Sequence, residues 1–156
     1  MNHLIERVTT HPFFRGMKPP HLAILAECAA VASFKPDEIH FREGDPANEF
    51  YIIESGRIAL EAHELADGTA LVQRLGAGEV LGWSWLFSPF IYQFQARAIE
   101  PTEVIVLNGG HLLVATESDH EFGYELMKRL AQVVIHRLQA TRKQLLALQI
   151  ESAMEG

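Results

Sequence analysis

The fold is decided by the stretch FREGDPANEFYIIESGRI, which covers residues 41–58. Its first part is polar and places Gly44 beside acidic residues, a composition typical of a tight turn. Residues 50–53 are apolar and β-prone, and Glu54-Ser55-Gly56 ends that run. The stretch therefore predicts a turn, a buried strand and a second turn. Glycine suits both turns because a Cβ atom is penalised where φ is positive.

Short β-type runs continue on the C-terminal side of this stretch. Residues 57–65 alternate between apolar and polar side chains, and residues 70–75 form a second run after Asp67-Gly68, a pair that hairpin turns favour. Residues 102–107 contain Val104, Ile105 and Val106 and predict a later strand. Because no helix alternates with these strands, the pattern predicts a sandwich or barrel and not a parallel sheet.

The N-terminal residues have helical periodicity instead. Pro19-Pro20 suits the first turn of a helix, and small or apolar residues then recur at helical spacing: Leu22, Leu25, Ala26, Ala29 and Ala30. Cys28 lies in the same alanine-rich stretch and is expected to be a small buried hydrophobic residue. Residues 1–32 are therefore predicted to form a helical segment.

The C-terminal part predicts one long helix over residues 119–150, with Asp119 or Ser118 as its N-cap. Steps of four and three residues alternate along a heptad seam made of Met127, Ala131, Val134, Leu138, Thr141, Leu145 and Leu148. Some 30 helical residues span about 45 Å, which is longer than a small barrel covers. The seam is therefore expected to pair two copies in a homodimer, with Arg137, Arg142 and Lys143 solvated on its flanks.

Composition places the chain among ordinary globular proteins. Its 156 residues are 48% hydrophobic and carry 13 Lys and Arg against 20 Asp and Glu, a net charge of −7. An acidic chain attracts nucleic-acid backbones poorly over its surface. A single cysteine excludes an intramolecular disulfide, and neither a membrane-spanning run nor a secretory signal is found. We expect a single cytoplasmic domain with no membrane association.

Taken together, these motifs resemble the cyclic-nucleotide-binding domain family, the sensor module of catabolite-activator-type regulators and cyclic-nucleotide-dependent kinases. Four segments carry the resemblance: residues 12–17, 41–58, 78–82 and 137–141. The resemblance implies an α+β fold in which a jelly-roll, cupin-like antiparallel β-barrel lies between N-terminal helices and a long dimerisation helix. Within a single domain of residues 1–156, the three parts are expected at residues 1–32, 33–108 and 119–150.

The phosphate-binding cassette is where this sequence departs from the family. The resemblance implies a glycine-led short helix, a glutamate for the ribose hydroxyl and an arginine for the cyclic phosphate. Aligned on Gly82, the glutamate position holds Trp83, the arginine position holds Tyr92 and its small neighbour is Gln93. Binding of cyclic AMP in the usual way is therefore not expected. The candidate ligand-binding residues are Gly82, Trp83, Ser84, Tyr92, Gln93 and, by resemblance to the bacterial regulators' adenine-contacting threonine, Thr141.

Six aromatic residues fall within residues 83–94, and they leave three interpretations open. The first is a sensor whose altered pocket takes an apolar or aromatic small-molecule effector. The second is a protein interaction module whose pocket is filled by its own rings. The third is a regulator that binds a cyclic nucleotide by atypical contacts. The sequence favours a non-enzymatic sensor or regulatory module without a cofactor, and it leaves the effector and any protein partner unidentified.

Two other classes are less compatible with the sequence. A metal-dependent cupin enzyme would need histidines where Glu43, Asp45 and Glu49 stand, and no histidine lies between His63 and His111. The remaining histidines are expected at the surface or at caps, so no metal site is predicted.

A DNA-binding regulator would need a helix-turn-helix domain after the long helix. Only residues 151–156 follow it, too few for three helices, so no direct DNA binding is predicted.

Overall fold

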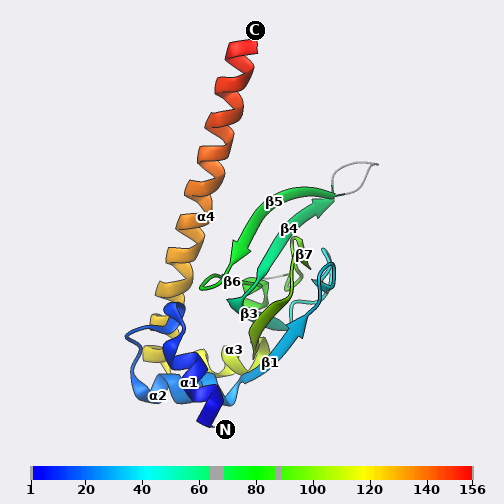
Figure 1. Cartoon of the computed structure of the whole chain (residues 1–156). Helices are drawn as coiled ribbons and strands as arrows, with labels where there is room; N and C mark the ends of the chain where they lie inside the picture. Colours follow the sequence, from blue (N-terminus) through cyan, green and yellow to red (C-terminus); the bar gives the residue numbers. More distant parts are fainter. Residues whose placement is uncertain (1, 64–68, 87–88, 156) are drawn as a thin grey trace.

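The computed structural model describes residues 2–63, 69–86 and 89–155 (Figure 1). Helical elements come first: α1 (Asn2–Thr10), the short 3-10 helix η1 (Pro12–Phe14) and α2 (Pro19–Glu27). Pro19 opens α2, as predicted, because a residue without an N–H group loses no hydrogen bond in the first turn. The predicted hairpin turn at Asp67-Gly68 lies outside the described residues.

The strands form two four-stranded antiparallel sheets. One sheet has the order β1-β8-β3-β6 and the other β2-β7-β4-β5. Their bounds are β1 Ala29–Phe34, β2 Ile39–Phe41, β3 Glu49–Ser55, β4 Arg57–His63, β5 Thr69–Gly76, β6 Val80–Leu81, β7 Gln95–Ala98 and β8 Thr102–Asn108. The predicted α+β fold with antiparallel strands is confirmed, but the two sheets do not join into a closed barrel within the described chain.

The N-terminal boundary of the β region was predicted wrongly. Ala29 and Ala30 fit the helical spacing of α2, yet α2 ends at Glu27 and β1 begins at Ala29. The reason is tertiary: β1 lies against β8, with Ala29 opposite Leu107 and Phe34 opposite Thr102. Ladder pairing outweighs the helix propensity of alanine, which is a weak preference.

Strand alternation places one hydrophobic core between the sheets. Ile58 and Leu60 of β4 point into it, as the alternating pattern predicted, while Ile52 of β3 and Ile105 of β8 lie opposite each other in the facing sheet. Phe14 of η1 is fully buried in the same core. Because burial of such a side chain contributes about 1.5–3 kcal/mol, this shared core fixes how the sheets face each other.

Two further helices follow the sheets: α3 (Gly109–Ser118), which the sequence analysis missed, and α4 (His120–Glu155). The Asp119 carboxylate caps α4 by accepting a hydrogen bond from the Phe122 N–H at 3.1 Å. With 36 residues, α4 is about 54 Å long. Its early residues, among them Leu126 and Leu130, are buried, and it then runs past the sheets (Figure 1). Among the described helices, none is long and apolar enough to span a membrane.

Gly44 and Gly56 have similar positive φ angles, but only Gly56 lacks space for a Cβ atom, so substituting each by alanine distinguishes the cost of backbone strain from the cost of a steric clash. Gly44 has φ +90° and open space where a Cβ would lie, whereas at Gly56, φ +95°, that atom would lie 2.5 Å from the Pro101 carbonyl oxygen and 2.6 Å from the Thr102 Cα. We expect Gly44→Ala to lower the free energy of unfolding by about 1–2 kcal/mol, the cost of left-handed backbone. Gly56→Ala should cost at least about 2 kcal/mol more. Urea unfolding at one protein concentration measures both, and equal losses would contradict the packing described for Gly56.

Candidate functional site

The predicted cassette lies between β6 and β7 and begins with the 3-10 helix η2 (Trp83–Leu86). Gly82 precedes η2 with φ +87°, and a Cβ there would lie 3.0 Å from the Glu49 carbonyl oxygen. The position therefore requires glycine for two local reasons, its backbone angle and its contact with β3.

A small cavity lies at the predicted cassette. Five of the six candidate residues line it: Gly82, Trp83, Ser84, Tyr92 and Gln93. Aromatic rings from Phe41 and Phe94 and the side chain of Arg137 complete much of the wall. Its volume is about 90 Å³, whereas small-molecule sites in proteins usually measure about 300–1,000 Å³. In this conformation the aromatic side chains occupy most of the space.

Tyr92, predicted to stand at the position of the family's arginine, is fixed to the protein by its ring and its hydroxyl. The ring stacks on Phe41 with centroids 3.7 Å apart. The hydroxyl donates to the Glu49 carbonyl oxygen at 2.7 Å and accepts from the Glu49 N–H at 3.1 Å. Burial raises the pKa of Tyr92 to about 12. Tyr92 is thus a neutral wall of the cavity that braces the start of β3.

Trp83, predicted to stand at the position of the family's glutamate, is covered by a cation from the long helix. The Arg137 guanidinium lies 4.4 Å from the centroid of the Trp83 ring, a cation–π distance. Its Nη2 donates to the Val80 carbonyl oxygen, and the Arg137 carbonyl oxygen accepts from the Gln73 side chain at 3.3 Å. Burial lowers the pKa of Arg137 to about 10.

The prediction that Arg137 is solvated on the flank of a coiled coil is therefore wrong. The sequence contained a signal for its true position. Leu126, Leu130 and Val133 are spaced by four and three residues on the face of α4 that packs against the protein, and a further step of four reaches Arg137.

Thr141 is not brought to the cavity. It is exposed on α4, and its hydroxyl donates to the Arg137 carbonyl oxygen at 2.9 Å, one turn back along the same helix. This back-bond is common for threonine in helices and needs no ligand.

The predicted seam of α4 is largely exposed in the single chain. Leu138, Leu145 and Leu148 have 68%, 55% and 62% of their surface exposed. Nearer the sheets, Met127, Ala131 and Val134 form a wholly apolar groove of about 430 Å³ with Trp83, Leu86, Leu130 and Ile135. The seam and the cassette thus meet at Trp83.

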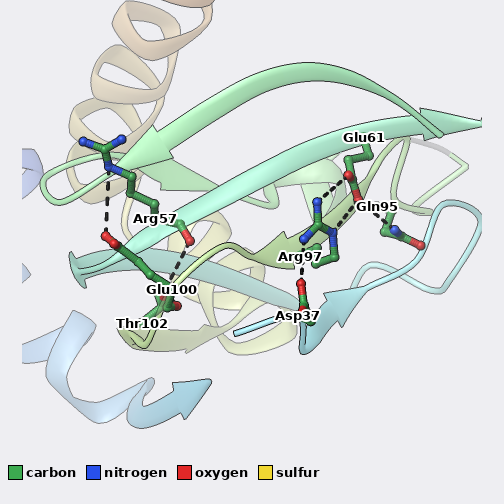
Figure 2. Close-up of polar contacts among 7 residues, drawn as sticks. All are labelled: Asp37, Arg57, Glu61, Gln95, Arg97, Glu100 and Thr102. Atoms are coloured by element: carbon green, nitrogen blue, oxygen red, sulfur yellow. Dashed lines mark hydrogen bonds and ion pairs between the residues drawn. The ribbon is translucent and has the colours of Figure 1, made fainter. Parts of the chain in front are cut away.

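Arg97 is the nearest cation in sequence to Tyr92, but its guanidinium is paired with other residues (Figure 2). Its Nη2 lies 2.9 Å from Glu61, and its Nη1 donates to Asp37 at 2.9 Å. Gln95 donates to the same Glu61 carboxylate at 3.0 Å. Hydrogen bonds from Arg97 hold the pKa of Glu61 below its usual value. Arg97 and Gln95 lie two residues apart on β7 and both contact Glu61, whereas Tyr92 precedes that strand.

Histidines were expected at the surface or at caps, and the buried His21 and the half-buried His40 correct that expectation. His11 does cap η1, because its Nδ1 accepts from the Phe13 N–H at 3.1 Å. His40 instead stacks on Phe34 with centroids 3.6 Å apart, and both of its ring nitrogens are buried without a hydrogen-bond partner. Within the described residues, no group of three or more His, Cys, Asp or Glu side chains is placed to hold a metal ion.

Comparison with known proteins places the chain in a family. The family model described as the cyclic nucleotide-binding domain matches residues 31–119, more than half of the chain. In sequence, the chain is 37% identical over 70 residues to the acetyltransferase Pat of Mycolicibacterium smegmatis, a match that covers 45% of this chain and 21% of that protein. The chain therefore spans about a fifth of that relative's length.

Solved structures agree in fold. A Geobacter metallireducens protein described as cyclic nucleotide-binding is 27% identical, with a TM-score of 0.77 over 85% of this chain and 96% of that one. The Thermus thermophilus catabolite activator protein is 23% identical, with a TM-score of 0.69 over 91% of this chain and 65% of that one. The second likeness is one of fold alone.

The buried His40 predicts how stability depends on pH. Burial lowers the pKa of His40 from 6.5 to about 4. Between these values the unfolded chain binds a proton that the folded protein excludes, so stability falls as the pH drops from about 6.5 to 4, by about 3 kcal/mol in all. We expect His40→Phe to remove this loss and to be no less stable at pH 7, because it deletes two unpaired polar atoms.

Urea unfolding at pH 7 and pH 4.5 measures the effect. His11, whose pKa burial also lowers, keeps its own contribution in both proteins. The exposed His120→Gln serves as a control that should retain the decline. If His40→Phe declined as steeply as the unmutated protein, His40 would not be buried as a neutral ring.

Proposed function

This chain belongs to the cyclic nucleotide-binding domain family, and from that premise we propose that it is a sensor whose cassette takes an apolar or aromatic effector in place of a cyclic phosphate. A cyclic nucleotide-binding regulatory domain is the general assignment. The observation that carries the finer proposal is the pairing of Trp83 with Arg137, because it closes the cassette and attaches it to α4 in a single contact.

Charge argues against a cyclic phosphate in this cavity. Trp83 and Tyr92 replace both charged family contacts, and Arg97 is already paired with Glu61 and Asp37. An anion moved from water into an apolar site without hydrogen-bonded neutralisation loses several kcal/mol. Rings from Phe41, Trp83 and Tyr92 instead offer flat apolar surface to an uncharged aromatic compound.

The same pair supplies a route from ligand to helix. A compound entering a cavity of about 90 Å³ must displace a wall, and Trp83 is the wall that also contacts α4. Movement of the ring removes the cation–π contact, worth about 0.5–2 kcal/mol, and frees Arg137 from its position. We therefore propose that effector binding changes how α4 is held, and that this change is the regulatory output.

The small cavity volume favours one alternative, a protein interaction module whose own aromatic side chains replace the ligand. In that case the same fold presents α4 to a partner, and no small molecule changes its stability. We propose in either case that residues 1–156 act as one non-enzymatic domain.

We also propose that two copies pair through α4. The seam residues Leu138, Leu145 and Leu148 are exposed in one chain, and each would gain about 1.5–3 kcal/mol by burial. The apolar groove that ends at Trp83 continues the seam toward the sheets. If two chains pair about a two-fold axis parallel to α4, the seam and the groove of each chain are buried against the same surfaces of the other chain.

Ligand choice is tested by thermal denaturation with 1 mM cyclic AMP and, separately, with uncharged aromatic probes such as indole. We expect no shift with cyclic AMP. A bound aromatic compound at 100 times its dissociation constant should add about 2.7 kcal/mol, a rise of about 2–4 °C or more in Tm, and Trp83→Leu should reduce that rise. A saturable shift with micromolar cyclic AMP would overturn the proposal. No response to any aromatic probe would favour the interaction module.

The dimer is tested by sedimentation of the full chain at tens of micromolar. We expect about twice the chain mass of 17.5 kDa, and Leu145→Glu should weaken association at least about 100-fold by burying a charge in the seam. Gln139→Glu adds the same charge on α4 outside the seam and should leave the dimer intact. A monomeric unmutated protein would refute the pairing.

A further inference from the structure

A second and larger cleft lies outside the cassette cavity, between α4 and the turn that joins β5 to β6. Its volume is about 310 Å³, within the range of small-molecule sites. Gln73, Arg74 and Glu79 line it from the sheet side, and His136, Arg137 and Gln144 line it from α4. Polar side chains thus converge on it from both walls, in contrast to the aromatic cavity.

The cleft contains a half-buried cation that forms no close ion pair within the described residues. Among the residues that the structure describes, no carboxylate lies within ion-pair distance of the Arg137 guanidinium. Glu79 is the acid of the cleft: its carboxylate accepts a hydrogen bond from the Gly76 N–H at 2.7 Å, and its charge raises the pKa of Arg137 against the larger lowering by burial. Because buried charges in proteins are normally paired at close range, a nearer anionic partner would stabilise the Arg137 guanidinium further.

Basic character extends along the same side of α4. An adjoining cleft of about 260 Å³ shares Gly78, Val133 and His136 with the first and adds Arg129. The Nη1 of Arg129 donates to the Phe13 carbonyl oxygen at 2.8 Å, and its Nε lies 3.9 Å from the Glu125 carboxylate. In a chain with a net charge of −7, Arg74 and Arg137 bring two positive charges to a cleft in which Glu79 is the acid.

We propose that the cleft between α4 and the β5–β6 turn binds a small organic anion, whose phosphate or carboxylate group pairs with Arg137. The guanidinium fork matches either group with two parallel hydrogen bonds. The side-chain amides of Gln73 and Gln144 line the same cleft and can form hydrogen bonds with the polar part of such a ligand. Because Arg137 also covers Trp83, an anion bound here holds the arginine in place and stabilises the closed cassette.

Calorimetric titration of the full chain with pyrophosphate and with citrate, at constant ionic strength, tests this site. We expect saturable binding of at least one anion, and the stronger of the two identifies phosphate or carboxylate as the preferred group. Arg137→Gln should weaken that binding at least tenfold, and Arg74→Gln at least threefold. Lys143→Gln removes one charge from an exposed position of α4 outside the cleft and should change the binding less than twofold.

Two outcomes would overturn the site. One is the absence of saturable heat with either anion up to 20 mM. The other is an equal weakening by Lys143→Gln, which would indicate diffuse attraction by the whole helix. If Arg137→Gln disturbs folding, the anion affinity of Arg74→Gln alone tests the site, because Arg74 is at an exposed position on β5. The proposed effector cavity is probed with uncharged aromatic compounds, so the two proposals fail separately.

Discussion

A guanidinium lying over an indole ring connects the two functional parts of this protein. Arg137 belongs to the long helix and Trp83 to the cassette, and their contact is reinforced by the hydrogen bond from Arg137 to the Val80 carbonyl oxygen. Beyond Leu130, the described contacts that hold α4 to the sheets are few, and the Gln73 hydrogen bond to the Arg137 backbone is another of them. The position of the outer helix therefore depends on a few polar contacts near one turn.

The rest of the cassette is shaped by β3. The Tyr92 hydroxyl both donates a hydrogen bond to the Glu49 carbonyl oxygen and accepts one from the Glu49 N–H, and Gly82 packs against the same residue. Phe41 then stacks on the Tyr92 ring. Neutral aromatic side chains therefore line this side of the cassette cavity. The proposal of an uncharged effector rests on these side chains, whereas the family assignment rests on the sequence match over residues 31–119.

Local patterns predicted those features that depend on local chemistry. Glycine turns, the alternation of β4, the opening of α2 and the Asp119 cap follow from backbone angles and hydrogen bonds within a few residues. Features set by distant partners were missed: β1 begins at Ala29 because β8 pairs with it, and His40 is buried because Phe34 and Tyr51 enclose it. The position of Arg137 was predicted wrongly because the prediction used the heptad seam alone and not the neighbouring row of Leu126, Leu130 and Val133, which packs against the rest of the protein.

A double-mutant cycle between Trp83 and Arg137 tests the central claim most directly. Trp83→Leu, Arg137→Met and the double variant are compared by urea unfolding at one protein concentration. The account predicts a coupling free energy of about 0.5–2 kcal/mol, as expected for a partly desolvated cation–π pair. Losses that add to within about 0.3 kcal/mol would show that the two side chains do not interact, and the cassette would then have no contact of this kind with α4.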